Sequence, residues 1–209
     1  MPRKKQNLEK QISTYHHGDL RATLILAARK LLQKNGYEAI SLRSIASEIG
    51  VTHMAPYAHF KGKQELLQAV AASGYDELAA NMLTTQKKNP KTRGHSLAYH
   101  YGVEYIQFAL GNPNLYRLMM NQINFDQKTK MEIPDRELWV SSQRPFRLLY
   151  AAFANEGSGK DLAHAKALGA WAIVHGIASL AIEGHLVLPR GMDIIQLFKT
   201  TVGSSMELE

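Results

Sequence analysis

The sequence predicts an all-α protein, in which a long helix joins an N-terminal three-helix helix-turn-helix bundle to a C-terminal helical domain. Apolar residues recur at helical spacing along most of the 209 residues. Capping residues, Gly and Pro separate these stretches, and none of them alternates as a half-buried strand would. We therefore expect a basic arm over residues 1–17, a helix-turn-helix domain over 18–64 and a helical domain over 65–209.

The N-terminal third holds start and stop signals for two short helices. Asp19 can cap a first helix over residues 19–34, which Gly36 ends. Ser41 can cap a second helix over residues 42–49. Both stretches have an apolar stripe on one face, so the two helices are predicted to pack against each other.

A tight turn and a third short helix follow. Gly50 can adopt the positive φ that ends the second helix, and the Thr52 hydroxyl can cap the third. Pro56 lacks an amide, so we expect it to loosen the start of this helix without breaking it. Helix, turn and short helix in this order predict a recognition helix that enters the major groove of DNA.

The positive charge lies in the same part of the chain. The protein carries a net charge of +7, and residues 1–63 contain 11 Lys and Arg against 4 Asp and Glu. Residues 64–209 contain 14 of each kind and are neutral. This asymmetry is typical of a nucleic-acid-binding unit. The basic arm either reaches into a groove or only aids solubility, and both alternatives stay open.

Several residues in this region form one motif with fixed internal spacing. They are Gly36-Tyr37, Ser41-Leu42-Arg43-Ser44-Ile45-Ala46, Gly50-Val51-Thr52, Tyr57-Ala58-His59-Phe60, Lys63 and Leu66-Leu67. With them, the segment from about Gly18 to Leu67 resembles the DNA-binding domain of the tetracycline-repressor (TetR) family. The resemblance implies base contacts from Arg43, His53, Met54 and Ala55. It implies phosphate contacts from Thr52, Tyr57, His59 and Lys63.

The rest of the chain is also predicted to be helical. The expected helices span residues 64–86, 95–110, 113–122, 135–155, 161–188 and 192–206. Gly74 would be a soft point in the first of these, and Pro145 should kink or divide the fourth. Residues 124–134 are polar and are expected to form a mobile connection.

The helix expected over residues 161–188 carries small residues along one line. They are Ala165, Gly169, Ala172, Gly176 and Ser179, at alternating steps of four and three. Such a line lets another helix approach closely. The helix is therefore either the centre of a monomeric core or, as we favour, part of a two-fold dimer interface with the last helix. Its apolar stretch is short for a membrane span, which favours a buried helix.

Trp171, His175 and Gly176 form a Trp-x-x-x-His-Gly pattern that resembles the WHG-type regulatory domain of one branch of TetR-like regulators. The resemblance implies a domain that senses small molecules. Aromatic and Met residues are spread over its helices, where they either line a cavity or only fill the core. The candidate ligand-binding residues are Tyr101, Tyr105, Phe108, Met120, Trp139, Trp171 and His175. The expected effector is small and largely apolar.

These observations predict a ligand-responsive transcriptional regulator, by default a repressor, that binds a palindromic operator on double-stranded DNA as a homodimer through its last two helices. No phosphate-binding loop, HExxH motif or cysteine is present, so no enzyme, metal or cofactor is expected. The absence of cysteine and of a signal sequence favours a cytoplasmic protein away from the membrane. The alternatives are a structural DNA-binding protein without sequence preference and, less favoured, an all-α enzyme fused to a DNA-binding head.

Overall fold

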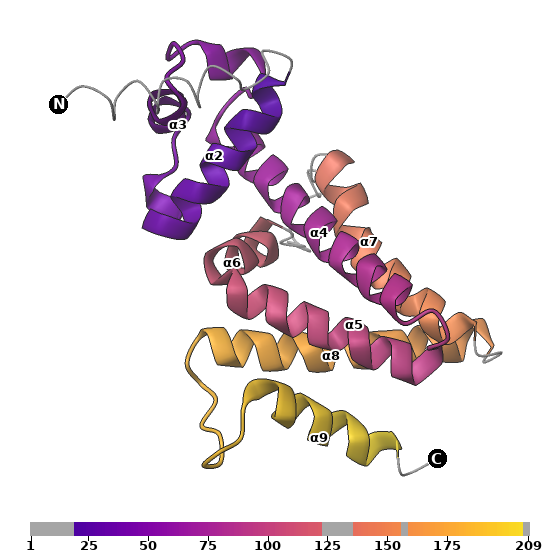
Figure 1. The fold of residues 1–209 in the computed structure, drawn as a ribbon. Coiled ribbons are helices and arrows are strands. Elements are labelled where there is room, and N and C mark those ends of the chain that lie inside the picture. Colours follow the sequence, from indigo (N-terminus) through magenta and orange to yellow (C-terminus); the bar gives the residue numbers. More distant parts are fainter. Residues whose placement is uncertain (1–18, 123–135, 156–158, 207–209) are drawn as a thin grey trace, which may run out of the picture. The chain divides into compact units, whose positions relative to one another are not determined.

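The computed structural model describes residues 19–122, 136–155 and 159–206, and this part of the chain contains helices and no strand (Figure 1). The predicted all-α class is therefore confirmed. The fold divides into two compact units, residues 1–66 and residues 67–209, which are described separately below. The proposed basic arm and the polar connection over residues 124–134 lie outside the described residues.

The first unit begins with helix α2 (Leu20–Asn35), whose two ends are set by local hydrogen bonds. The Asp19 carboxylate accepts a hydrogen bond from the Ala22 amide at 3.0 Å, as expected of an N-cap. At the other end Gly36 has a φ of 77° and donates its amide hydrogen to the Leu32 carbonyl. Both predicted signals are confirmed.

Helix α3 (Leu42–Ile49) begins at a complete capping box made of two serines. The Ser41 hydroxyl accepts from the Ser44 amide at 2.9 Å, and the Ser44 hydroxyl accepts from the Ser41 amide at 3.0 Å. Ser44 thus fills the role that Glu or Gln usually has at this position. Gly50 ends the helix with a φ of 71°, as the sequence predicts.

The third helix differs from the prediction, because it is a 3₁₀-helix, η2 (Ala55–Ala58), and Thr52 does not cap it. The Ala55 amide donates to the Thr52 carbonyl, three residues back, at 3.0 Å. An α-helix would bring the amide of residue 56 to that carbonyl, and Pro56 has none. The missing donor therefore tightens this turn into 3₁₀ winding. A second 3₁₀-helix, η1 (Tyr37–Ala39), connects α2 to α3.

Helix α4 (Lys63–Lys88) runs without interruption through the division between the two units. Gly74, expected to be a soft point, is instead a site of close packing in the second unit. A Cβ at this position would lie 2.6 Å from the Met119 sulfur, so a larger residue would require the Met119 side chain to move. Next to it the Tyr75 hydroxyl donates to the Met119 carbonyl at 3.2 Å.

The second unit contains the remaining helices, which are α5 (Gly94–Gly111), α6 (Pro113–Gln122), α7 (Arg136–Ala154), α8 (Lys160–Ile182) and α9 (Ile194–Met206). Pro113 occupies the first position of α6, as predicted. Pro145 lies inside α7 and does not divide it. Helices α5, α7 and α8 pack against one another and form the core of the unit (Figure 1).

Helix α8 ends at Ile182, short of the predicted residue 188. Gly184 has a φ of 72°, and the His185 amide donates back to the Leu180 carbonyl at 2.8 Å. This is the bonding pattern of a Schellman motif, which the apolar residues further on concealed in the sequence.

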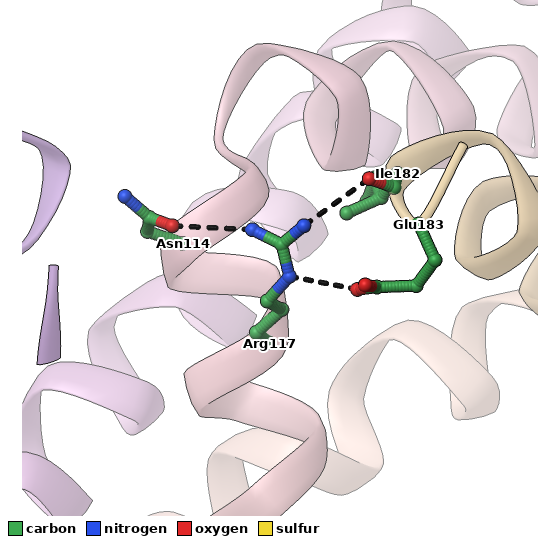
Figure 2. A network of polar contacts seen from close by, with 4 residues as sticks. All are labelled: Asn114, Arg117, Ile182 and Glu183. Carbon is green, nitrogen blue, oxygen red and sulfur yellow. Dashed lines mark hydrogen bonds and ion pairs between the residues drawn. The ribbon is translucent and has the colours of Figure 1, made fainter.

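Arg117 of α6 holds the end of α8 from the side (Figure 2). Its guanidinium donates to the Glu183 carboxylate at 2.7 Å, to the Ile182 carbonyl at 3.1 Å and to the Asn114 side-chain oxygen at 3.2 Å. A cation that binds the last carbonyl of a helix also interacts favourably with the helix dipole. The contact therefore fixes α6 to the C-terminal end of α8.

Candidate nucleic-acid interface and effector cavities

The residues predicted to contact DNA form an exposed surface on the first unit. Arg43 of α3 and the side chains of Thr52, His53 and His59 are all exposed. Met54 is 73% exposed and Tyr57 51%, whereas Ala55 is half-buried. Large apolar side chains in such positions are unfavourable in water and are available to touch a base or a sugar.

Two buried residues hold this surface in place. Pro56 and Phe60 point into the unit, and Phe60 is 1% exposed. The Arg21 guanidinium lies 5.4 Å from the centre of the Phe60 ring, on its face. The short 3₁₀-helix is therefore anchored from below while its polar side chains face the solvent.

Lys63 differs from the other predicted phosphate contacts. Its ammonium group donates to the Tyr37 carbonyl at 3.3 Å and lies 4.3 Å from the centre of the Tyr37 ring. Tyr37 is 44% exposed and lies beneath the Lys63 ammonium group.

The second unit contains a cavity of about 230 Å³ between α4, α5, α7, α8 and α9. Three of the candidate ligand-binding residues, Tyr101, Tyr105 and Trp171, line it. Its other lining residues come from five helices, so no local pattern marked them. They include Met82, Ala98, Tyr99, Gly102, Phe153, Val174 and Phe198.

A further cavity of about 330 Å³ lies between α4, α6, α7 and α8. Met120, Trp171 and His175 of the predicted set line it, together with Tyr75, Ser142, Gln143, Phe146 and Leu168. Phe108 and Trp139, the other two candidates, line neither cavity. Phe108 of α5 is buried in the core of the second unit, and Trp139 is 36% exposed.

Trp171 lines both cavities. A hydrogen bond joins Tyr105, which lines the first cavity, to His175, which lines the second. The Tyr105 hydroxyl lies 2.7 Å from His175 Nδ1, and His175 Nε2 lies 2.8 Å from the Met120 sulfur. A thioether only accepts, so Nε2 carries the proton and Nδ1 accepts from Tyr105. Burial lowers the pKa of His175, which favours this neutral form.

Helix α8 exposes the line of small residues that the sequence singled out. Ala165, Gly169, Ala172, Gly176 and Ser179 are all exposed. Only 22% of the most apolar stretch of this helix is buried within the chain, so the expectation of a buried helix is wrong for the single chain. Within the described residues α8 alone is long and apolar enough to cross a membrane, by length and composition only.

A helix-turn-helix with exposed donors, followed in the chain by a helical unit with apolar cavities, is the architecture of a DNA-binding transcriptional regulator. Comparison with known families gives the same class. Residues 24–70 match the bacterial regulatory proteins of the tetR family, and residues 99–204 match the tetracycline repressor-like C-terminal domain. The chain belongs to the tetracycline-repressor family of DNA-binding transcriptional regulators, which are not enzymes.

Individual relatives are similar over different parts of the chain. The nicotine-responsive repressor HdnoR of Paenarthrobacter nicotinovorans is 39% identical over 64 residues, which cover 31% of this chain and 33% of that protein. A Rhodococcus structure of unknown function is 28% identical, with a TM-score of 0.75 and coverage of 91% and 95% of the two chains. A TetR family regulator from Marinobacter aquaeolei is 17% identical, with a TM-score of 0.58 and coverage of 88% and 94%. This last likeness bears on the fold alone.

Proposed function

We propose that this regulator is a repressor that binds a palindromic operator as a homodimer and leaves it when a small, largely apolar effector binds the second unit. The observation that carries the proposal is the exposed surface at Thr52–His59, on the part of the chain that holds the whole net positive charge. Such a surface offers hydroxyl, imidazole and guanidinium donors to phosphates and base edges.

The individual contacts are those that the resemblance to the family implies. Bases would be contacted by Arg43, His53, Met54 and Ala55. Phosphates would be contacted by Thr52, Tyr57, His59 and Lys63. Because the recognition segment is a single 3₁₀ turn, few side chains reach base edges from one protomer. Two half-sites then supply the specificity that one short element lacks.

The exposed face of α8 supports the homodimer. Small residues along it let a second copy of the helix approach closely, and the exposed Leu168 and Leu180 flank them. Exposing an apolar face of this kind to water is unfavourable, so a partner that covers it stabilises the complex by burying apolar surface. Helix α9, which packs on α5 and α8, would complete the interface.

The same helix offers a route from effector to DNA. Gly169, an exposed residue of the small-residue line, also lines the 230 Å³ cavity. A ligand in that cavity would therefore lie next to the proposed interface, and α4 continues from the second unit into the first. An effector releases DNA only if it binds the released conformation more tightly than the bound one.

The test is fluorescence anisotropy of the full-length protein with DNA flanking its own gene, at two salt concentrations and with scrambled DNA as competitor. We expect binding that resists the competitor and is lost in a His53→Ala/Tyr57→Phe variant, whereas His185→Ala, exposed in the second unit, binds as wild type. Equal, strongly salt-dependent binding to both DNAs would mean phosphate contact alone. That result would favour the structural DNA-binding alternative.

A further inference from the structure

The 230 Å³ cavity is lined by a buried tyrosine whose hydroxyl group has no hydrogen-bond partner among the described residues. Tyr101 is 2% exposed, and no described residue bonds its hydroxyl. Every fully enclosed side-chain nitrogen or oxygen of the described residues has a partner. The Tyr101 hydroxyl is therefore not fully enclosed, and the residue lines this cavity.

The other buried tyrosines near this cavity have hydrogen-bond partners for their hydroxyl groups. The Tyr75 hydroxyl donates to the Met119 carbonyl, and those of Tyr105 and Tyr116 bond His175 and each other. A molecule in the cavity can accept a hydrogen bond from the Tyr101 hydroxyl without breaking one within the protein. Burial raises the pKa of Tyr101, and its hydroxyl is therefore a donor at neutral pH.

The walls of the cavity suit a flat ring. The Tyr99 and Phe198 rings are stacked, with their centres 5.5 Å apart and their planes 2° apart, and Trp171 lies in the wall formed by α8. Aromatic walls favour aromatic guests through stacked and edge-to-face contacts. His95 and Lys166 also line the cavity, and each already has an interaction of its own.

The volume limits the size of the guest. An apolar cavity of about 150 Å³ holds benzene, so the 230 Å³ found here accommodates a somewhat larger molecule, of the size of two fused six-membered rings. The other cavity is a weaker candidate, because the hydroxyl of Tyr75 and both ring nitrogens of His175 already have partners there.

We propose that the cavity beside Tyr101 is the effector site and that it takes an uncharged, bicyclic-sized aromatic molecule with one acceptor atom, to which the Tyr101 hydroxyl donates. The proposal rests on the ligand response proposed above. It names the anchoring residue and the chemical class of the ligand.

The test compares quinoline with naphthalene, which has the same shape but no acceptor, by equilibrium dialysis against the full-length protein. We expect Tyr101→Phe to weaken quinoline binding by about three- to ten-fold, the loss typical of one hydrogen bond, and to leave naphthalene binding unchanged. Tyr150→Phe is the matched control, since Tyr150 lines neither cavity and should change the binding of neither probe.

A second variant tests the location without relying on the hydroxyl. Ala170 lines the cavity and is half-buried, so Ala170→Phe should fill the space and weaken both probes by about ten-fold or more. The proposal is overturned if wild type binds neither probe, if Tyr101→Phe weakens both equally, or if Ala170→Phe weakens neither.

Operator binding is measured on the same preparations, so that the two proposals can fail separately. Specific operator binding without the expected probe pattern overturns the effector site and leaves the regulator intact. The expected probe pattern without specific operator binding overturns the proposed function and supports the site.

Discussion

The two units expose opposite kinds of surface. At Thr52–His59 the first unit presents polar and aromatic side chains above a closed small core, whereas α8 of the second unit presents glycine, alanine and leucine. Polar donors are stable in water and exchange it for phosphates when DNA arrives. A long apolar face forms no hydrogen bonds with water and is stable only when it is covered. The first surface therefore suits a partner that comes and goes, and the second suits a lasting one.

The two surfaces are also supported differently. In the first unit, bonds between residues three or four apart set the helix ends, as at Asp19 and Ser41. In the second unit, bonds between distant residues also join separate helices. The Arg117–Glu183 ion pair fixes α6 to the end of α8 (Figure 2). Tyr105 bonds His175 across 70 positions of the chain.

The largest expected effect comes from placing a charge on the apolar face. Ala172→Arg would bury an unpaired cation in the proposed interface, which is strongly unfavourable. We expect a monomer by light scattering and a loss of operator affinity of about 100-fold or more, because the second half-site no longer contributes. Ala151→Arg on the exposed side of α7 is the control and should stay dimeric. An Ala172→Arg protein that remains a dimer would mean that the interface lies elsewhere.

A smaller effect is expected from the polar surface. His53→Ala removes one exposed side chain at a proposed base contact, and we expect it to cost about 1–3 kcal/mol of operator binding. The loss should be larger on operator than on scrambled DNA, as anisotropy titrations of both would measure. Equal losses on the two DNAs would assign His53 to the phosphates instead. Thermal unfolding should not change, since the residue is exposed.

Packing in the second unit should respond to a single methyl group. A Cβ at Gly102 would collide with the Phe198 ring of α9, so we expect Gly102→Ala to destabilise the protein by about 1–3 kcal/mol in urea unfolding. Gly111, at the end of the same helix, has open space around it. Gly111→Ala is therefore the control and should cost much less. Equal stabilities of the two variants would contradict the close approach of α9 to α5.

The smallest effect is a dependence of stability on pH. Burial lowers the pKa of His175 in the folded protein, so below the ordinary pKa of histidine the unfolded chain binds the extra proton more readily. Its contribution to stability is complete above that pKa and is lost as the pH falls. Between about pH 7.5 and pH 5.5, wild type should lose up to about 1 kcal/mol more than His175→Asn in urea unfolding. Parallel pH curves for the two proteins would show that His175 is not the cause.

The sequence determined most of the first unit. Asp19, Gly36, Ser41 and Gly50 mark the ends of α2 and α3 in the structure as they do in the sequence. Two predictions, the type of the recognition helix and the end of α8, were wrong, and their causes are also local. Pro56 tightened the recognition segment into a 3₁₀-helix, and Gly184 ended α8 before its apolar run was over. Both depend on backbone bonds that composition alone does not reveal.

The tertiary structure alone decided which aromatic residues line a cavity. Tyr101, Phe108 and Trp139 looked alike in the sequence, yet the first lines a cavity, the second is buried in the core and the third is partly exposed. A capping residue acts on amides three or four positions away, so the local sequence contains all that determines it. A cavity exists where side chains from several helices fail to fill the space between them, and no single segment of the chain contains that information.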